Sequence, residues 1–252
     1  MSSASSGAVA GGLLSACMAV RPPGPGICRI CCGAILGHYE ECWSCRQIEE
    51  RLGRPLTPIT PISLAVDGTP VYTALKQYKG HHEPTARRQQ LRLAGLIGIF
   101  LRHHTRCIAV EGFDAVAAVP SLQGRDGLHP LVTTLGLIGS LRPAIINALS
   151  PGTGRVARNS PSLEAYLTRH DLVVDRRILL VDDTYTTGAH LHSAAASLIS
   201  AGAREIYPLV VGRRQNRAWP PSQHLAEWSA LGENRWSSTR CIHCWSRDPA
   251  MS

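Results

Sequence analysis

Hydrophobic residues follow two alternating spacings along the chain from Val71 onward. Short apolar runs of strand length occur in FDAVAAVP, RPAIINALS, RRILLVDD and REIYPLVVG. Apolar residues recur at helical spacing in VYTALKQYKG, ARRQQLRLAGLIGIFLRHH, HPLVTTLGLIGSL and GAHLHSAAASLISAGA. Strands separated by helices predict an α/β fold, in which helices flank a parallel sheet. Ligands of such sheets bind beyond the carboxyl ends of the strands.

The run ILLVDDTYTTGAH places two carboxylates, Asp182 and Asp183, at one of these strand ends. The loop 184–190 then begins a helix, whose first N–H groups lack internal partners and whose dipole favours anions. The loop is therefore a candidate phosphate site, with threonine hydroxyls as donors and Gly188 to allow close approach. An acidic pair beside a phosphate site suits a ligand with two hydroxyls, such as a ribose. A plain helix N-cap is the alternative, because Asp and Thr both cap well.

The segment CRICCGAILGHYEECWSC contains two CxxC pairs, Cys28 with Cys31 and Cys42 with Cys45. Four thiolates in this spacing are the ligands of a structural Zn²⁺ ion. Two unrelated reduced pairs are the alternative. Cys32 and His38 lie close enough in sequence to act as substitute ligands, but neither improves on the four cysteines.

A third pair, Cys241 and Cys244, is half of a metal site. It could pair with another chain, with Cys32 and His38, or with nothing, and the sequence leaves these alternatives open. We predict one Zn²⁺ per chain, held by the four N-terminal cysteines of the two CxxC pairs. The histidine pairs 81–82 and 103–104 are expected at the surface.

The formal net charge of +8 comes almost wholly from arginine, since the only lysines are Lys76 and Lys79. Arginine suits phosphate, so the partner could be a nucleic acid or a phosphorylated small molecule, unless codon bias explains the excess. Few aromatic residues are available to stack on bases, so binding to single-stranded DNA is expected to be weak and salt-sensitive.

The remaining segments suggest a division of the chain into five parts. No apolar run is long enough to span a bilayer, and no positive residue precedes the first apolar segment as in a secretory signal. A cytoplasmic protein is therefore expected, and nine cysteines in such a chain indicate metal binding or reduced thiols rather than disulfides. The expected parts are a disordered tail (1–26), a zinc ribbon with a short helix (27–53), a linker (54–70), the main domain (71–214) and a C-terminal tail (215–252).

The centre of ILLVDDTYTTGAH, residues 181–188, resembles the phosphoribosyl diphosphate (PRPP) motif of type I phosphoribosyltransferases. With the paired CxxC, the helix ALKQYKG and the loop VPSLQGRDG, the chain is similar to the ComF-type subgroup, which joins a zinc ribbon to that domain. The resemblance runs from residue 28 to about residue 214. It implies a phosphoribosyltransferase-like sheet and a PRPP ligand bound with Mg²⁺.

The resemblance also assigns roles to residues. Asp182 and Asp183 would hold the ribose, and the 5′-phosphate would contact Thr184, Thr186, Thr187, Gly188 and Ala189. Tyr185 and His190 of the same loop would also take part in PRPP binding. His190 stands where the family usually has threonine or serine. The diphosphate loop would use Ser121 and Arg125, although the Arg-Gly-Phe-Asn-Gln run of ComF relatives is missing there. Arg155 and Arg158 would lie on a mobile catalytic loop, or would be solvated loop charges.

Two functions follow from this resemblance. The first is an enzyme that transfers the 5-phosphoribosyl group from PRPP to a nitrogen nucleophile and releases diphosphate. The second is a non-catalytic, ComF-like module that uses the PRPP pocket as a sensor in competence or DNA processing, with a DNA-processing protein as a further partner. The acceptor and the oligomeric state are left open, no membrane partner is expected, and Tyr78 and Lys79 are expected to pack on the ribbon.

Overall fold

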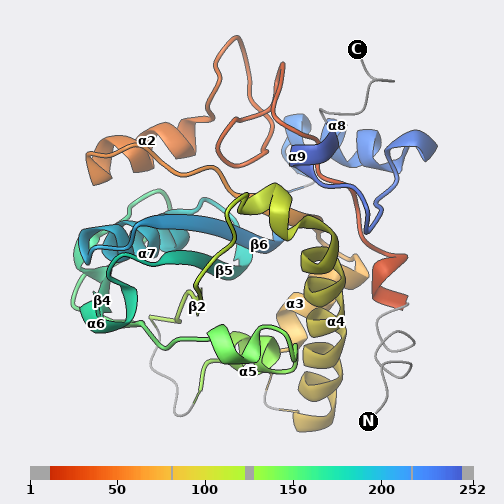
Figure 1. The fold of residues 1–252 in the computed structure, drawn as a ribbon. Helices are drawn as coiled ribbons and strands as arrows, with labels where there is room; N and C mark the ends of the chain where they lie inside the picture. The colour runs from red at the N-terminus through yellow and green to blue at the C-terminus, as the bar shows by residue number, and fades with distance from the viewer. Residues whose placement is uncertain (1–11, 81, 123–127, 217, 246–252) are drawn as a thin grey trace.

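A computed structural model describes residues 12–80, 82–122, 128–216 and 218–245. Its central sheet has four strands in the order β1-β6-β5-β2, and all of its pairings are parallel (Figure 1). These strands are β1 (Thr60–Val66), β2 (Ala115–Ala118), β5 (Arg177–Tyr185) and β6 (Glu205–Gln215). The predicted α/β fold, with a parallel sheet flanked by helices and an N-terminal four-cysteine cluster, is confirmed.

Helices cover both faces of the sheet, which explains the uninterrupted apolar run of β5 (Figure 1). Ile178 and Leu180 pack into the core on one face, and Leu179 and Val181 pack into the core on the other. The first face is covered by α2 (Trp43–Leu52) and α7 (Ala189–Ser200). The second is covered by α3 (Pro70–Gln77), α4 (Glu83–Ile108) and α5 (Pro130–Gly136).

The range 54–70, expected as a linker, contains β1, which pairs with β6 from Thr60 opposite Leu209 to Val66 opposite Gln215. This part of the linker prediction is wrong. Pro61 made the segment look broken, but β1 lies at the edge of the sheet, where a proline is tolerated because only one side of the strand needs its ladder.

The apolar run 142–150 was expected as a strand of the sheet, and this is also wrong. It forms the 3₁₀ turn η1 (Arg142–Ala144), one parallel bridge from Ile145 to Val116, and then β3 (Leu149–Pro151). β3 pairs with β4 (Tyr166–Thr168) in a separate antiparallel hairpin. The short η2 (Leu163–Ala165) and α6 (His170–Val173) complete this region.

Segments from both ends of the chain lie against the sheet edge at β1. Leu13 is fully buried, and Met18 forms an antiparallel bridge to Leu64. The C-terminal segment forms α8 (Pro220–Ala230), η3 (Gly232–Asn234) and α9 (Ile242–Trp245). Residues 12–26 are thus ordered, whereas 1–11 of the expected disordered tail lie outside the described residues. The other domain boundaries stay predictions.

Within the part of the chain that the structure describes, no helix combines the length and the apolar character needed to cross a bilayer.

Candidate functional site

A cavity of about 320 Å³ lies where β2 and β5 end and α7 begins. Residues that follow β2, Val119, Pro120 and Leu122, form its apolar wall. Its polar lining includes Lys79, Ser121, Asp182, Asp183, Thr184 and His190. Five of these six residues were singled out from the sequence as candidate ligand contacts, and the structure brings them together.

The Asp183 side chain points to the face of the sheet that α3 covers. It is 5% exposed, and its Oδ2 accepts a hydrogen bond from the Tyr78 hydroxyl at 2.6 Å. Lys79 Nζ lies 2.5 Å from the same oxygen. The carboxylate is therefore held in one orientation at the cavity by a phenol and a cation.

Tyr78 and Lys79 were expected on the zinc ribbon, but the structure places Lys79 in the cavity lining and Tyr78 against Asp183. Residue 183 lies on the same face of β5 as Leu179 and Val181, because successive side chains of a strand point to opposite faces. That face is covered by α3, whose end carries Tyr78 and Lys79. The alternation of side chains along β5 predicts which face of the sheet residue 183 occupies. The contact with Tyr78 and Lys79 could have been predicted only if ALKQYKG had also been placed on that face.

Asp182 differs from its neighbour in its electrostatics. Its Oδ1 accepts the backbone N–H of Asp183 at 2.8 Å. Burial, and then the negative charge of Asp183, raise the pKa of Asp182 to about 8, while Lys79 acts in the opposite direction. Asp182 is therefore largely protonated at neutral pH in the unliganded site.

This shift predicts that Asp182 makes the unliganded protein less stable as the pH rises. The folded pKa lies above the ordinary value of about 3.9 for the unfolded chain. The stabilisation that this raised pKa gives is therefore fully present below about pH 4 and is lost as the pH rises to about 8. Urea unfolding of the wild type and Asp182→Asn at pH 6 and pH 9 should show the variant gaining relative stability at pH 9. Equal differences at the two pH values would contradict the shift.

The loop between β5 and α7 presents backbone donors near the cavity. Gly188 is the N-cap of α7, has φ of 94°, and supplies no side chain to the first-turn N–H groups. A Cβ at this position would lie 2.2 Å from the Tyr185 hydroxyl, so the turn requires glycine in both conformation and space. The start of α7 therefore keeps the anion-binding character expected from the sequence.

Tyr185 itself points away from the cavity. Its side chain is 1% exposed, and its hydroxyl lies 3.6 Å from Cys45 Sγ and 3.1 Å from His192 Nε2. Only its backbone remains for the ligand contact that the resemblance assigned. Of the next residues, Thr186 is exposed, Thr187 is half-buried and Ala189 is buried, and none of the three lines the cavity.

His190 does line the cavity, and its Nδ1 lies 3.0 Å from the Tyr166 hydroxyl. Burial, and then the charge of Lys79, lower the pKa of His190. The imidazole is therefore neutral at pH 7 and can serve as a hydrogen-bond partner in place of the hydroxyl that the family usually has there.

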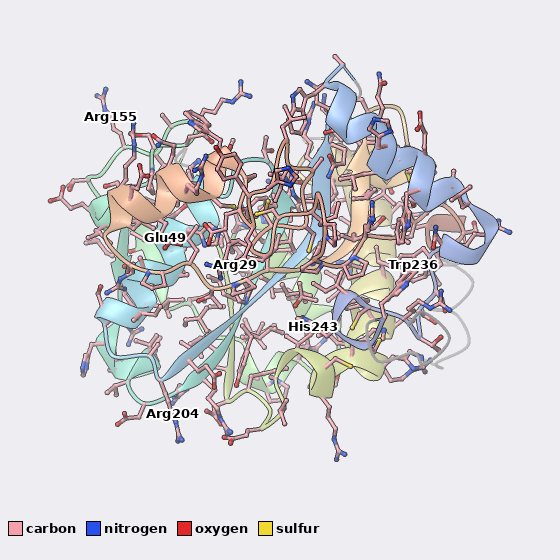
Figure 2. All side chains as sticks on the ribbon, turned by 90° about the horizontal axis from the view of Figure 1, so that it is seen from above. Arg29, Glu49, Arg155, Arg204, Trp236 and His243 are labelled. Carbon is pink, nitrogen blue, oxygen red and sulfur yellow. The ribbon has the colours of Figure 1, made fainter. Side chains whose placement is uncertain are left out.

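The arginines assigned to the diphosphate side are not gathered at the cavity. Arg155 and Arg158 are exposed, and Figure 2 shows Arg155 at the outer edge of the molecule. Arg125 lies outside the described residues. The catalytic role of Arg155 and Arg158 stays a prediction.

The four N-terminal cysteines form one cluster that could hold a metal ion. Ligand atoms of Cys28, Cys31, Cys42 and Cys45 all lie within 4.8 Å of one another, and the sulfurs of Cys31 and Cys42 are 3.7 Å apart. Hydrogen bonds from the other three thiols lower the pKa of Cys31 well below its ordinary value, and the charge of Arg213 adds to the effect. The two CxxC pairs thus converge as predicted, with the donor set that zinc prefers.

Arg213 on β6 connects this cluster to the β5–α7 loop. Its Nε donates to the Cys31 carbonyl at 2.8 Å, and its second guanidinium nitrogen lies 3.4 Å from Cys31 Sγ. The remaining nitrogen donates to the carbonyls of Tyr185 and Thr186 at 3.4 and 3.3 Å. No signal in the sequence marked Arg213, because Cys31 and Tyr185, which accept its hydrogen bonds, are separated from it by 182 and 28 positions along the chain.

Comparisons with known proteins add little to this geometry. No protein-family model matches the chain, and no curated protein sequence matches it. A solved structure with partial similarity is described as the structure of the allosteric regulatory enzyme of purine biosynthesis. It is 18% identical, covers 45% of this chain and 26% of its own, and has a TM-score of 0.29. The present chain thus spans about a quarter of that enzyme, and so distant a likeness carries no argument about the cavity.

Proposed function

We propose that the chain binds PRPP with Mg²⁺ in this cavity and transfers the 5-phosphoribosyl group to a nitrogen nucleophile, with release of diphosphate. The observation that supports it most is the convergence of Asp182, Asp183 and the uncapped start of α7 on one cavity. The resemblance of residues 181–188 to the PRPP motif gives the ligand its identity.

Each part of the ligand has a complementary group. The two carboxyl groups accept hydrogen bonds from the ribose hydroxyls, and such bonds are strong where the acceptor is ionised, a state of Asp182 that bound Mg²⁺ would favour. The first N–H groups of α7 receive the 5′-phosphate, and Thr184, which lines the cavity, offers a hydroxyl donor. Lys79, which lines the cavity, adds a positive charge on the acidic side.

Magnesium fits this donor set, because Mg²⁺ prefers carboxylate and phosphate oxygens and retains several waters. When bound with PRPP, Mg²⁺ would neutralise charge on the departing diphosphate. The side chains of the protein act on the ribose. As the bond to diphosphate lengthens, the ribose becomes positively charged, and the fixed carboxylates stabilise that charge without reorganising.

A second candidate is the PRPP-binding sensor without turnover, in a ComF-like competence or DNA-processing module. The exposed positions of Arg155 and Arg158 favour it. Among the described residues that line the cavity, Lys79 is the sole lysine or arginine, so the diphosphate has few charge partners there. Both candidates require the same PRPP site and differ only in turnover.

Calorimetric titration with PRPP and Mg²⁺ tests the shared site through the only two lysines of the chain. Lys79→Gln is expected to weaken PRPP binding roughly 10-fold or more, because it removes a charge-assisted contact of about 1.5–3 kcal/mol. Lys76→Gln is the matched control, since Lys76 lies on α3 over the Tyr72 ring and does not line the cavity. Equal losses in the two variants would contradict a role for Lys79 in the site.

Diphosphate release then separates the two candidates. Wild-type protein is incubated with PRPP, Mg²⁺ and, in turn, a purine, a pyrimidine or ammonia. Release that depends on one acceptor supports the transferase. Binding without release for any acceptor supports the sensor, and absence of binding contradicts both.

A further inference from the structure

Four metal-binding side chains meet at the end of α4, far along the chain from the N-terminal cysteine cluster. They are His104 and Cys107 on α4, with Cys241 and Cys244 at the start of α9. One ligand atom from each lies within 4.8 Å of the other three. Sequence analysis had left Cys241 and Cys244 as half of a site, and the structure supplies the other half.

The distances agree with the edges of a metal-centred tetrahedron. With metal–sulfur bonds of about 2.3 Å, two sulfur ligands lie about 3.8 Å apart. The sulfurs of Cys241 and Cys244 are 3.5 Å apart, and His104 Nδ1 lies 3.8 Å from Cys107 Sγ and 3.9 Å from Cys244 Sγ. These values resemble the 3.7 Å between Cys31 and Cys42 in the N-terminal cluster.

Both pairs are arranged locally so that their ligand atoms face the same point. His104 and Cys107 are three residues apart on α4, which places them on one side of the helix. Cys241 and Cys244 have CxxC spacing, and the backbone N–H of Cys241 donates to Cys244 Sγ at 3.1 Å. The N-terminal cluster has the equivalent bond, from the Cys42 N–H to Cys28 Sγ at 3.3 Å. Such bonds orient a sulfur for a metal.

The position of His104 also sets this cluster apart from ordinary buried thiols. The sequence led us to expect His104 at the surface, but its side chain is 2% exposed, whereas its neighbour His103 is exposed. Thiols that pack merely as small apolar groups need no imidazole nitrogen among them. Three cysteines and one histidine are instead a common ligand set of structural zinc.

We propose that His104, Cys107, Cys241 and Cys244 bind a second Zn²⁺ ion. Four protein ligands fill a tetrahedral site and leave no open position, so the ion is structural rather than catalytic. It joins the C-terminal segment to α4 across more than a hundred residues of chain. The proposal is independent of the function of the PRPP site.

The joined segment covers the edge of the sheet at β1. His243 Nε2 lies 2.7 Å from Thr60 Oγ1, and Trp236 Nε1 donates to the Ile62 carbonyl at 2.8 Å. Figure 2 labels both side chains on the C-terminal segment. Since an uncovered edge strand invites pairing with other chains, the second ion would hold the segment that protects β1.

Zinc content of the full chain, purified with zinc and a phosphine reductant, tests the proposal. We expect two equivalents per wild-type chain, and one in each of the double variants Cys241→Ser, Cys244→Ser and Cys42→Ser, Cys45→Ser. His103→Ala, next to the ligand His104, is the matched control and should retain two. Circular dichroism of each variant records whether it folds.

Cobalt substitution identifies the ligands independently. Thiolate-to-cobalt absorption scales with the number of sulfur ligands, so the variant without Cys42 and Cys45 should show about three quarters of the intensity of the variant without Cys241 and Cys244. One zinc equivalent in the wild type would overturn the proposal. A disulfide between Cys241 and Cys244 in the reduced, zinc-loaded protein would overturn it as well.

Discussion

A variant with Cys42→Ser and Cys45→Ser is expected to lose one zinc equivalent and to melt more than about 10 °C below the wild-type protein. Structural zinc contributes roughly 10–16 kcal/mol of apparent binding free energy in zinc-finger peptides. Each kcal/mol shifts the melting temperature of a protein of this size by roughly 2–4 °C. Half of the lower binding figure therefore already gives about 10 °C.

The loss should extend into the main domain, because the cluster belongs to the principal core. Cys28, Cys31 and Cys45 pack in the same buried cluster as β5 and α7. Arg213 is also buried, and its charge faces Cys31. Without metal-bound thiolates, this arginine becomes a buried cation with weaker compensation, which is strongly unfavourable.

Elemental analysis and a thermal melt of the same samples measure both effects. Cys17→Ser is the matched control, because Cys17 is a buried thiol outside the cluster, and a serine hydroxyl can replace its hydrogen bond to the Leu13 carbonyl. It should retain the wild-type zinc content and melt within a few degrees of the wild type. A double variant with unchanged zinc content would contradict the assignment of the four cysteines.

Features encoded by short stretches of sequence were predictable. The apolar run of β5, the acidic pair after it and the glycine at the start of α7 all lie within residues 178–188, and each has a local physical reason. The paired CxxC spacing likewise predicted the N-terminal cluster, because metal geometry constrains short spacings strongly. Local patterns thus identified one wall of the cavity and one cluster.

Features that depend on distant contacts were not predictable from one sequence. Tyr78 and Asp183 are 105 residues apart, and His104 and Cys244 are 140 apart. β1 was missed because the prolines around it indicate a break, and only its place at the sheet edge makes Pro61 acceptable. Tyr185 was assigned to the ligand by its position in a motif, but its hydroxyl points to Cys45 of the N-terminal cysteine cluster behind the loop.

The remaining large effect concerns the cavity. Saturating PRPP with Mg²⁺ is expected to raise the melting temperature of the wild-type protein by about 5–10 °C. A ligand at a hundredfold excess over its dissociation constant adds about 2.7 kcal/mol to the free energy of unfolding. At roughly 2–4 °C per kcal/mol, that stabilisation gives the expected range.

Asp183→Asn should lose most of this ligand-induced shift. An amide keeps the shape of the carboxylate but removes the charge that strengthens its hydrogen bonds to ribose hydroxyls.

The unliganded variant should also be less stable, because Lys79 and Tyr78 both contact the Asp183 carboxylate in the folded protein. Each protein must therefore be compared with its own unliganded melt. Asp171→Asn is the matched control, since Asp171 is an exposed aspartate on α6 whose carboxylate pairs with Arg169. A full shift in the Asp183 variant would place the ribose elsewhere, and no shift in the wild type would exclude PRPP as the ligand of this cavity.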